Sequence, residues 1–128
     1  MDKPLILIAD DDRNIREGLT MRLEAAGFRV TAASCASSAT RMFDVLAPAA
    51  AILDVNMPDS DGFGVCEHIR QAGSEIPVFI LTGADAGIIR KNLDTLTATV
   101  GANHYVTKPY DAQELIGRLQ EAISAESY

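Results

Sequence analysis

The sequence predicts an α/β protein in which a parallel sheet is covered by helices on both faces. Short apolar runs and segments of helical periodicity alternate five times along the chain, with short connections between them. The apolar runs consist mainly of Ile, Leu, Val and Ala, which is typical of strands that are buried on both faces. Alternating strands and helices with short connections imply right-handed crossovers, so we expect parallel strands in one doubly wound sheet.

Five strands are predicted from the apolar runs. Each run has the length of a short strand and is bounded by turn-forming or charged residues, such as Pro77 before the fourth. The strands are expected at about residues 6–9, 29–33, 50–53, 78–81 and 104–107.

Five helices are predicted at about residues 12–26, 37–46, 62–72 and 86–99, and from residue 111 onward. Gly27 and Gly73 follow the first and third helices, where a left-handed residue commonly ends a helix. Pro48 prevents the second helix from continuing. Asp111, with Glu114 three residues later, predicts a capping box at the start of the last helix. Apolar residues at helical spacing define the expected inward faces: Ile15, Leu19, Leu23, Ala26, Met42, Phe43, Leu46, Val65, Cys66, Ile69, Leu115, Leu119, Ala122 and Ile123.

The length and composition are those of one domain with an aliphatic core. The chain has 128 residues, of which 48% are hydrophobic, and contains no Trp, so we expect a single domain over residues 1–128. The formal net charge of −7 argues against direct binding to nucleic acid, which normally requires a basic face, and against an anionic membrane as a partner. No apolar stretch approaches the roughly 20 residues that span a bilayer.

The first residues and the cysteines predict a cytoplasmic protein. The sequence runs from Met1 almost directly into the first strand, so no signal peptide is expected. Cys35 and Cys66 each lack a second cysteine at metal-binding or redox spacing. We therefore expect them to be small core residues of a reduced protein.

Four of the predicted strands end in residues that an apolar strand does not need. Residues 10–12, after the first strand, are all Asp; Asp54, Thr82 and Lys108 stand at the ends of the third, fourth and fifth strands. Ligands of open parallel sheets bind just beyond the carboxyl ends of the strands. If these strands are neighbours, the side chains converge on one site. Uncompensated like charges cost free energy, and a bound cation would explain why they are clustered.

Each of these residues also has an ordinary structural explanation. Asp12 suits the N-cap of the first helix, Thr82 could be a β-branched strand terminus, and Lys108 could be a solvated surface residue. Capping, however, accounts for one carboxylate and not for three. Carboxylate, carbonyl and water oxygens are the ligands that Mg²⁺ (or Mn²⁺) prefers. A site with two or three carboxylates would leave coordination positions for water and a substrate phosphate.

The order and spacing of these residues resemble the receiver (phosphoacceptor) domain of two-component response regulators. The resemblance covers nearly the whole chain, from Leu5 to Ile123. It is carried by an apolar strand that ends in three Asp residues, by Leu53-Asp54-Val55-Asn56-Met57-Pro58 with Asp61-Gly62, by Thr82-Gly83 and by Lys108-Pro109. In this order and at this spacing, the motifs are highly specific.

The resemblance implies a flavodoxin-like fold with the strand order 2-1-3-4-5. It further implies that Asp54 accepts a phosphoryl group from the phosphohistidine of a sensor histidine kinase or phosphotransfer protein, in a reaction that depends on Mg²⁺. Asp11, Asp54 and the backbone carbonyl of Asn56 would hold the metal directly. Asp10 would hold it through water.

The resemblance also implies how phosphorylation is detected. Thr82 would bond one phosphoryl oxygen and Lys108 would pair with another. Tyr105 falls where the family keeps a switch aromatic, so Thr82 and Tyr105 would move together and change the surface of the fourth helix, fifth strand and fifth helix. An output domain or effector protein would bind that surface, and phosphorylation could produce a homodimer. The domain would be regulatory rather than an enzyme, although it would assist its own phosphorylation and dephosphorylation.

Two other functions are weighed. A phosphatase of the haloacid-dehalogenase type also forms an aspartyl phosphate, but it uses an acidic residue two positions after the nucleophile. Here that position, relative to Asp54, is Asn56, and the chain leaves no room for a cap domain. A pseudo-receiver that only binds partners is a third reading, and the complete acidic set with Thr82 and Lys108 argues against it.

One departure from the family pattern lies between Thr82 and Lys108. These residues are separated by 25 others, about four more than the family pattern leads us to expect. Four residues make about one helical turn, so we expect an extended or re-angled fourth helix within residues 87–101. His104, at the start of the fifth strand, is expected to be exposed or hydrogen-bonded rather than a phosphotransfer residue.

Overall fold

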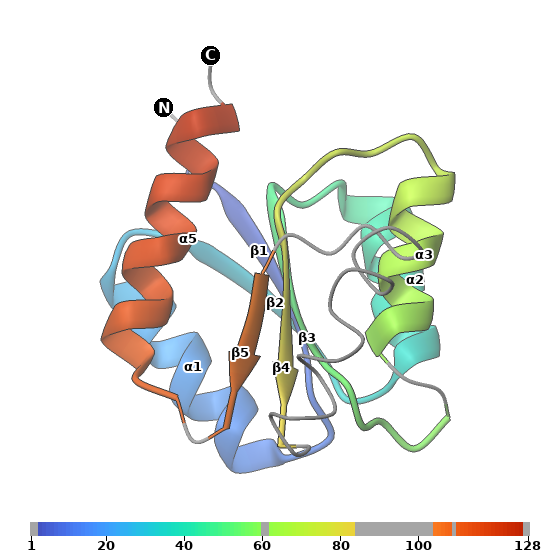
Figure 1. Ribbon diagram of the computed structural model, residues 1–128, viewed down its shortest axis with the longest axis horizontal. Helices are drawn as coiled ribbons and strands as arrows, with labels where there is room; N and C mark the ends of the chain where they lie inside the picture. The colour runs from blue at the N-terminus through green and yellow to red at the C-terminus, as the bar shows by residue number, and fades with distance from the viewer. Residues whose placement is uncertain (1–2, 60–61, 84–103, 109, 127–128) are drawn as a thin grey trace.

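A computed structural model describes residues 3–59, 62–83, 104–108 and 110–126, and it contains one five-stranded parallel sheet. The strand order is β2-β1-β3-β4-β5, as the resemblance implies (Figure 1). The strands are β1 (Leu5–Ala9), β2 (Arg29–Ala33), β3 (Ala50–Asp54), β4 (Val78–Thr82) and β5 (His104–Thr107). The helices are α1 (Arg13–Ala25), α2 (Ala36–Leu46), α3 (Gly62–Gln71) and α5 (Ala112–Glu126). The predicted fold class is therefore confirmed, with element bounds that differ by one or two residues.

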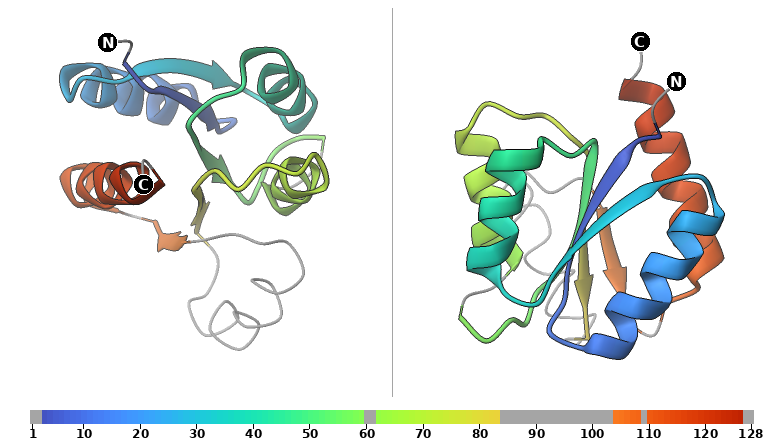
Figure 2. Two further views of the ribbon diagram at one scale, coloured as in Figure 1. Left: turned by 90° about the horizontal axis from the view of Figure 1, so that it is seen from above. Right: turned by 180° about the vertical axis from the view of Figure 1, so that it is seen from behind.

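The helices cover both faces of the sheet. α1 and α5 lie on one face, and α2 and α3 lie on the other (Figure 2). Successive side chains of a strand point to opposite faces, so neighbouring residues of the same strand enter different cores. Leu7 and Ala9 pack with α2 and α3, whereas Ile6 and Ile8 pack with α1 and α5. This is why the strands read as continuous apolar runs.

The ends of three helices follow the local sequence signals. The carboxylate of Asp12 accepts hydrogen bonds from the backbone N–H groups of Asn14 and Ile15 at the start of α1. Asp111 Oδ1 accepts from the N–H groups of Gln113 and Glu114 at the start of α5. Gly27 and Gly73, after α1 and α3, have φ values of 98° and 84°, which confirms the predicted left-handed positions.

Two details of the predicted core are wrong. Leu46, at the end of α2, is 46% exposed rather than buried, because the helix ends at this residue and Ala47 turns the chain in a left-handed conformation with φ 48°. Cys66 is buried as expected, but Cys35 is only half-buried. Cys35 occupies the N-cap of α2 at the edge of the core, and its Sγ lies 3.3 Å from Ser38 Oγ.

Several expectations lie outside the described residues. They are the fourth helix at about 86–99, the extra residues before β5, Asp61 and Pro109. Among the residues that the structure describes, no helix has the length and the apolar character that crossing a membrane requires.

Candidate functional site

The register of the sheet brings the predicted polar residues to one edge. Ala9 pairs with Leu53, so Asp10 and Asp54 follow directly on neighbouring strands. Thr82 pairs with Thr107, the residue before Lys108. The backbone N–H of Lys108 also donates to the Thr82 carbonyl at 2.7 Å. The four side chains that end β1, β3, β4 and β5 therefore stand at the same carboxyl edge.

The ammonium group of Lys108 bridges two buried carboxylates. Its Nζ lies 3.2 Å from Asp10 Oδ2 and 3.3 Å from Asp54 Oδ1. Asp10 is 0% exposed and Asp54 is 4% exposed. A buried charge needs a partner or a metal, and Lys108 supplies one positive charge for the two negative charges.

The charges in this site shift each other's pKa. Burial raises the pKa of Asp54, and repulsion from the Asp10 carboxylate raises it further, despite the opposing effect of Lys108. Burial alone would lower the pKa of Lys108, but attraction to Asp10 and Asp54 outweighs it and the pKa is raised. The site therefore keeps its ammonium charged, while the charged form of Asp54 is disfavoured in the protein without metal.

A third carboxylate completes a group that fits a divalent cation. Asp10, Asp11 and Asp54 each place a carboxylate oxygen within 4.8 Å of the others. Asp11 is exposed, whereas Asp10 and Asp54 are buried. With Lys108, the four side chains carry a net charge of −2. Hard oxygen ligands with this excess of negative charge suit Mg²⁺, which usually takes one or two carboxylates and keeps several waters.

The neighbours of the three carboxylates fix two of them by hydrogen bonds. Asp10 Oδ1 accepts from the backbone N–H of Asp12 at 2.9 Å, and the Asp10 carbonyl accepts from the guanidinium of Arg16 at 2.8 Å. The N–H of Asn56 points to Asp54 Oδ1 at 3.4 Å, and Asn56 is itself exposed. Asn56 thus lies beside Asp54, where the resemblance expects a metal ligand from its backbone.

The two residues expected to act as a switch lie on the same face of the sheet. Tyr105 pairs with Ile80 and packs with the core under α2 and α3. Thr82, two residues after Ile80 and 1% exposed, follows on that face because strand side chains alternate. The Tyr105 ring is half-buried, with its centroid 6.4 Å from that of Phe63 in α3.

Sequence reasoning missed three residues near the site. Gly62 lies so close to β3 that a Cβ there would collide with the Asp54 carbonyl oxygen; in the sequence, Gly62 stands out only as part of the Asp61-Gly62 motif. Tyr110 is half-buried, and burial and the Asp10 charge raise its pKa. Asp59, in the loop after β3, bonds to the start of α2. No local pattern signals this last contact, because its partners are distant in the sequence.

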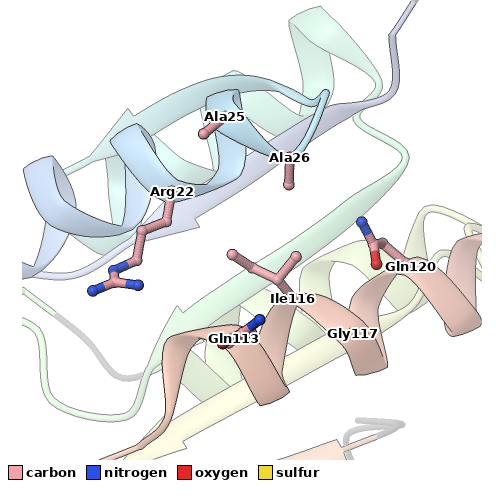
Figure 3. Close-up of a pocket in the computed structure, with 7 residues that line it drawn as sticks. All are labelled: Arg22, Ala25, Ala26, Gln113, Ile116, Gly117 and Gln120. Atoms are coloured by element: carbon pink, nitrogen blue, oxygen red, sulfur yellow. The ribbon is translucent and has the colours of Figure 1, made fainter.

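A separate groove of about 670 Å³ lies between α1 and α5 (Figure 3). Ile116 points from α5 toward α1, and Arg22 is the charged residue of the lining. The other lining residues are Ala25, Ala26, Gln113, Gly117 and Gln120. A groove of this composition offers no set of oxygen ligands comparable to the carboxylate edge.

Comparison with known proteins identifies the class. Residues 6–120 match the family model described as the response regulator receiver domain, and the chain belongs to this family. Receiver domains are regulatory domains of two-component signalling systems.

Individual relatives agree with the family. The chain is 39% identical over 119 residues to a probable transcriptional regulator, ycf27, of Cyanidium caldarium, covering 92% of this chain and 45% of the relative. It is 36% identical over 115 residues to the response regulator MprA of Mycobacterium ulcerans, covering 90% of this chain and 48% of the relative. The chain therefore spans about half the length of these relatives.

A solved structure supports the fold. The crystal structure of a CheY-like response regulator receiver domain protein from Methanospirillum hungatei superposes with a TM-score of 0.89 at 23% identity, covering 98% of both chains. This similarity concerns the fold alone.

Proposed function

We propose that this domain is a phosphorylation-dependent switch in which Asp54 is the phosphoacceptor. The observation that carries the proposal is the position of Lys108 between Asp10 and Asp54, with Asp11 beside them. A carboxylate used as a nucleophile needs neighbouring positive charge to receive a phosphoryl group that is itself negative. The carboxylate cluster and Lys108 supply a metal-ligand set and one fixed positive charge at that point.

The transfer is a displacement at phosphorus. A carboxylate oxygen of Asp54 attacks the phosphorus of a phosphohistidine on a sensor kinase or phosphotransfer protein. A P–O bond forms as the P–N bond to the donor imidazole breaks. Lys108, now paired with Asp54, would exchange that contact for a phosphoryl oxygen, and the Thr82 hydroxyl would donate to another.

Asp11, Asp54 and the backbone carbonyl of Asn56 would hold Mg²⁺, with Asp10 acting through water. When bound, the metal supplies positive charge to the phosphoryl oxygens and orients them. Asp10 also holds Lys108, so it would link the ammonium to the metal site. The domain would assist its own phosphorylation and later dephosphorylation without turning over a separate substrate.

Phosphorylation would be transmitted through Thr82 and Tyr105. Both residues lie on the sheet face under α3, and Thr82 stands at the phosphorylation edge. Movement of Thr82 toward a phosphoryl oxygen would vacate space that the Tyr105 ring could fill. This would shift the population between two packings of the fourth helix, β5 and α5. An output domain or effector would bind the favoured form in the cytoplasm. The same change of surface would allow two phosphorylated copies to form a homodimer.

The direct test is incubation with a small phosphodonor, such as acetyl phosphate, and Mg²⁺, followed by intact-protein mass spectrometry. We expect one added phosphoryl group, which is lost in Asp54→Asn and after chelation of the metal. Asp44→Asn is the matched control, because Asp44 is an exposed carboxylate on α2 that pairs with His68. This control should be phosphorylated like the wild type.

Two results would contradict the assignment. Phosphorylation that survives Asp54→Asn would place the acceptor elsewhere. A wild-type protein that takes up no phosphoryl group, yet still binds a partner, would favour the pseudo-receiver reading.

A further inference from the structure

The carboxylate of Asp59 ties the loop after β3 to the start of α2. Its Oδ1 accepts a hydrogen bond from the Ala36 N–H at 2.8 Å, and its Oδ2 accepts from the Ser37 N–H at 3.0 Å. These hydrogen bonds lower the pKa of Asp59, the bond from Ser37 having the larger effect. One ionised side chain thus satisfies two N–H groups of a helix that begins 23 residues earlier.

α2 needs this remote cap because its own N-cap residue does not supply one. The first N–H groups of a helix lack partners within the helix, and Ser, Thr, Asp or Asn at the N-cap usually satisfies some of them. Among the described residues, Cys35 is the N-cap of α2, and its side chain accepts no hydrogen bond from the first N–H groups of the helix. Its Sγ instead lies near the hydroxyls of Ser37 and Ser38.

The loop that Asp59 holds is the one that carries Asn56. Its beginning is fixed by the bond from the Val55 N–H to the Leu81 carbonyl, at 2.9 Å. Its end is fixed by the bond from the Gly62 N–H to the Val55 carbonyl, at 3.2 Å. Asp59 lies between these points, three residues after Asn56, and anchors the middle of the loop to a different helix.

We infer that Asp59 is a positioning residue for the metal site. By fixing the middle of the loop, it restricts the positions of the Asn56 backbone beside Asp54. The inference rests on the proposed function, because it assigns Asp59 a role only if Mg²⁺ binds at Asp54 and Asn56. Groups that orient metal ligands typically affect metal affinity by about 10- to 100-fold, and we expect the lower end here.

The test separates loop positioning from helix capping. Asp59→Ala removes both the cap and the tether. Cys35 has the extended N-cap conformation, with φ −153° and ψ 166°, so Cys35→Ser offers α2 a cap within its own sequence. The double variant Cys35→Ser/Asp59→Ala therefore regains the cap but not the tether, and Cys35→Ser alone is the matched control.

The measurements are the thermal midpoint without metal and the Mg²⁺ dissociation constant by isothermal titration calorimetry. We expect Asp59→Ala to lower the midpoint and to weaken Mg²⁺ binding about 10-fold. The double variant should recover the midpoint while its Mg²⁺ binding stays weak, and Cys35→Ser alone should bind like the wild type. Asp59→Asn, which keeps one oxygen acceptor, should fall between the wild type and Asp59→Ala.

Recovery of Mg²⁺ affinity together with the midpoint in the double variant would show that Asp59 is only a cap, and would overturn the inference. A different result identifies failure of the proposed function. A wild-type protein that neither binds Mg²⁺ nor accepts a phosphoryl group would overturn the proposed function, and the positioning role with it.

Discussion

The ammonium of Lys108 lies 3.3 Å from Oδ1 of Asp54, and this pair connects the ends of β5 and β3 across the intervening strand β4. Lys108 is also 3.2 Å from Asp10 Oδ2. The same ammonium therefore stabilises two buried carboxylates that repel each other. Two like charges held beside one ammonium cost fold stability, and this cost can be measured without any partner protein.

Asp54→Asn should stabilise the metal-free fold, because a pKa raised in the folded state means that the charged carboxylate costs folding free energy. The substitution removes a buried charge that also repels Asp10, and Lys108 keeps Asp10 as a partner. Urea denaturation with a chelator present would measure the gain. In millimolar Mg²⁺ the advantage should shrink or reverse, because the wild type gains stability from the metal and the variant gains less.

The stability advantage of Asp54→Asn over the wild type should increase with pH. The pKa of Asp54 is raised in the folded state, so the unfolded chain releases its proton at lower pH than the folded one. The wild type therefore loses stability as pH rises from about 4, the unfolded value, through the folded pKa. The advantage of Asp54→Asn should grow over that window and reach its full size above the folded pKa of Asp54. An advantage that is constant from pH 4 to pH 7 would contradict the assigned cause.

Lys108→Met should destabilise the metal-free fold by about 2 kcal/mol, less than a fully buried pair would lose because the Lys108 side chain is 23% exposed. The variant leaves Asp10 and Asp54 facing each other without positive charge. Combining it with Asp54→Asn should restore part of the loss, since the two changes act on the same contact. Purely additive effects in this double-mutant cycle would show that the two residues are not coupled.

The candidate site was predictable from sequence because its residues lie at strand ends. Asp10, Asp54, Thr82 and Lys108 each follow a recognisable apolar run, and a parallel sheet gathers the carboxyl ends of its strands at one edge. The strand order itself came from the family resemblance. Alternation alone does not determine which strands are neighbours.

The supporting contacts were not predictable, because they join segments that no local pattern connects. Asp59 looks like an ordinary loop residue until α2 is placed beside it, with Ala36 and Ser37 offering N–H groups. Gly62 looks like half of a turn until α3 begins against the Asp54 carbonyl. In both cases the determining fact is a distance between elements, which depends on packing rather than on periodicity.

Gly62→Ala should destabilise the fold by about 1–3 kcal/mol, the usual cost of inserting a methyl group where none fits. The added Cβ would meet the backbone oxygen of Asp54, which belongs to a fully buried strand and cannot move aside cheaply. The displaced Asp54 should also be phosphorylated more slowly. Chemical denaturation and the rate of modification by acetyl phosphate measure the two effects.

Gly18→Ala is the matched control for this glycine. Gly18 lies within α1, and nothing is within 4 Å of the position a Cβ would take there. Ala is favoured over Gly inside a helix by about 0.5–1 kcal/mol, so this variant should be more stable than the wild type. If Gly62→Ala is stabilised as Gly18→Ala is, helix propensity rather than the close approach to Asp54 determines the result.

His104 should make the fold less stable as the pH falls below about 6.5, the pKa of an unperturbed histidine. Its ring stacks on Phe79, with centroids 4.3 Å apart and an interplanar angle of 12°, and Arg118 donates to its Nδ1 at 3.1 Å. Burial lowers the pKa of His104, and the charge of Arg118 lowers it further. As the pH falls, the unfolded chain therefore takes up a proton on His104 before the folded one does. Stability is lost between the unfolded pKa and the lower folded pKa.

His104→Phe tests this dependence, because it keeps an aromatic ring against Phe79 but has no proton to gain. Between about pH 7 and pH 5 the wild type should lose stability relative to this variant, and the loss should be modest because His104 is only half-buried. Unfolding free energies measured by denaturant at several pH values provide the comparison. His68→Gln serves as the control histidine, since His68 pairs with Asp44 on the opposite face of the sheet. If the His104→Phe and wild-type curves run parallel between about pH 7 and pH 5, burial and the Arg118 charge do not keep His104 neutral.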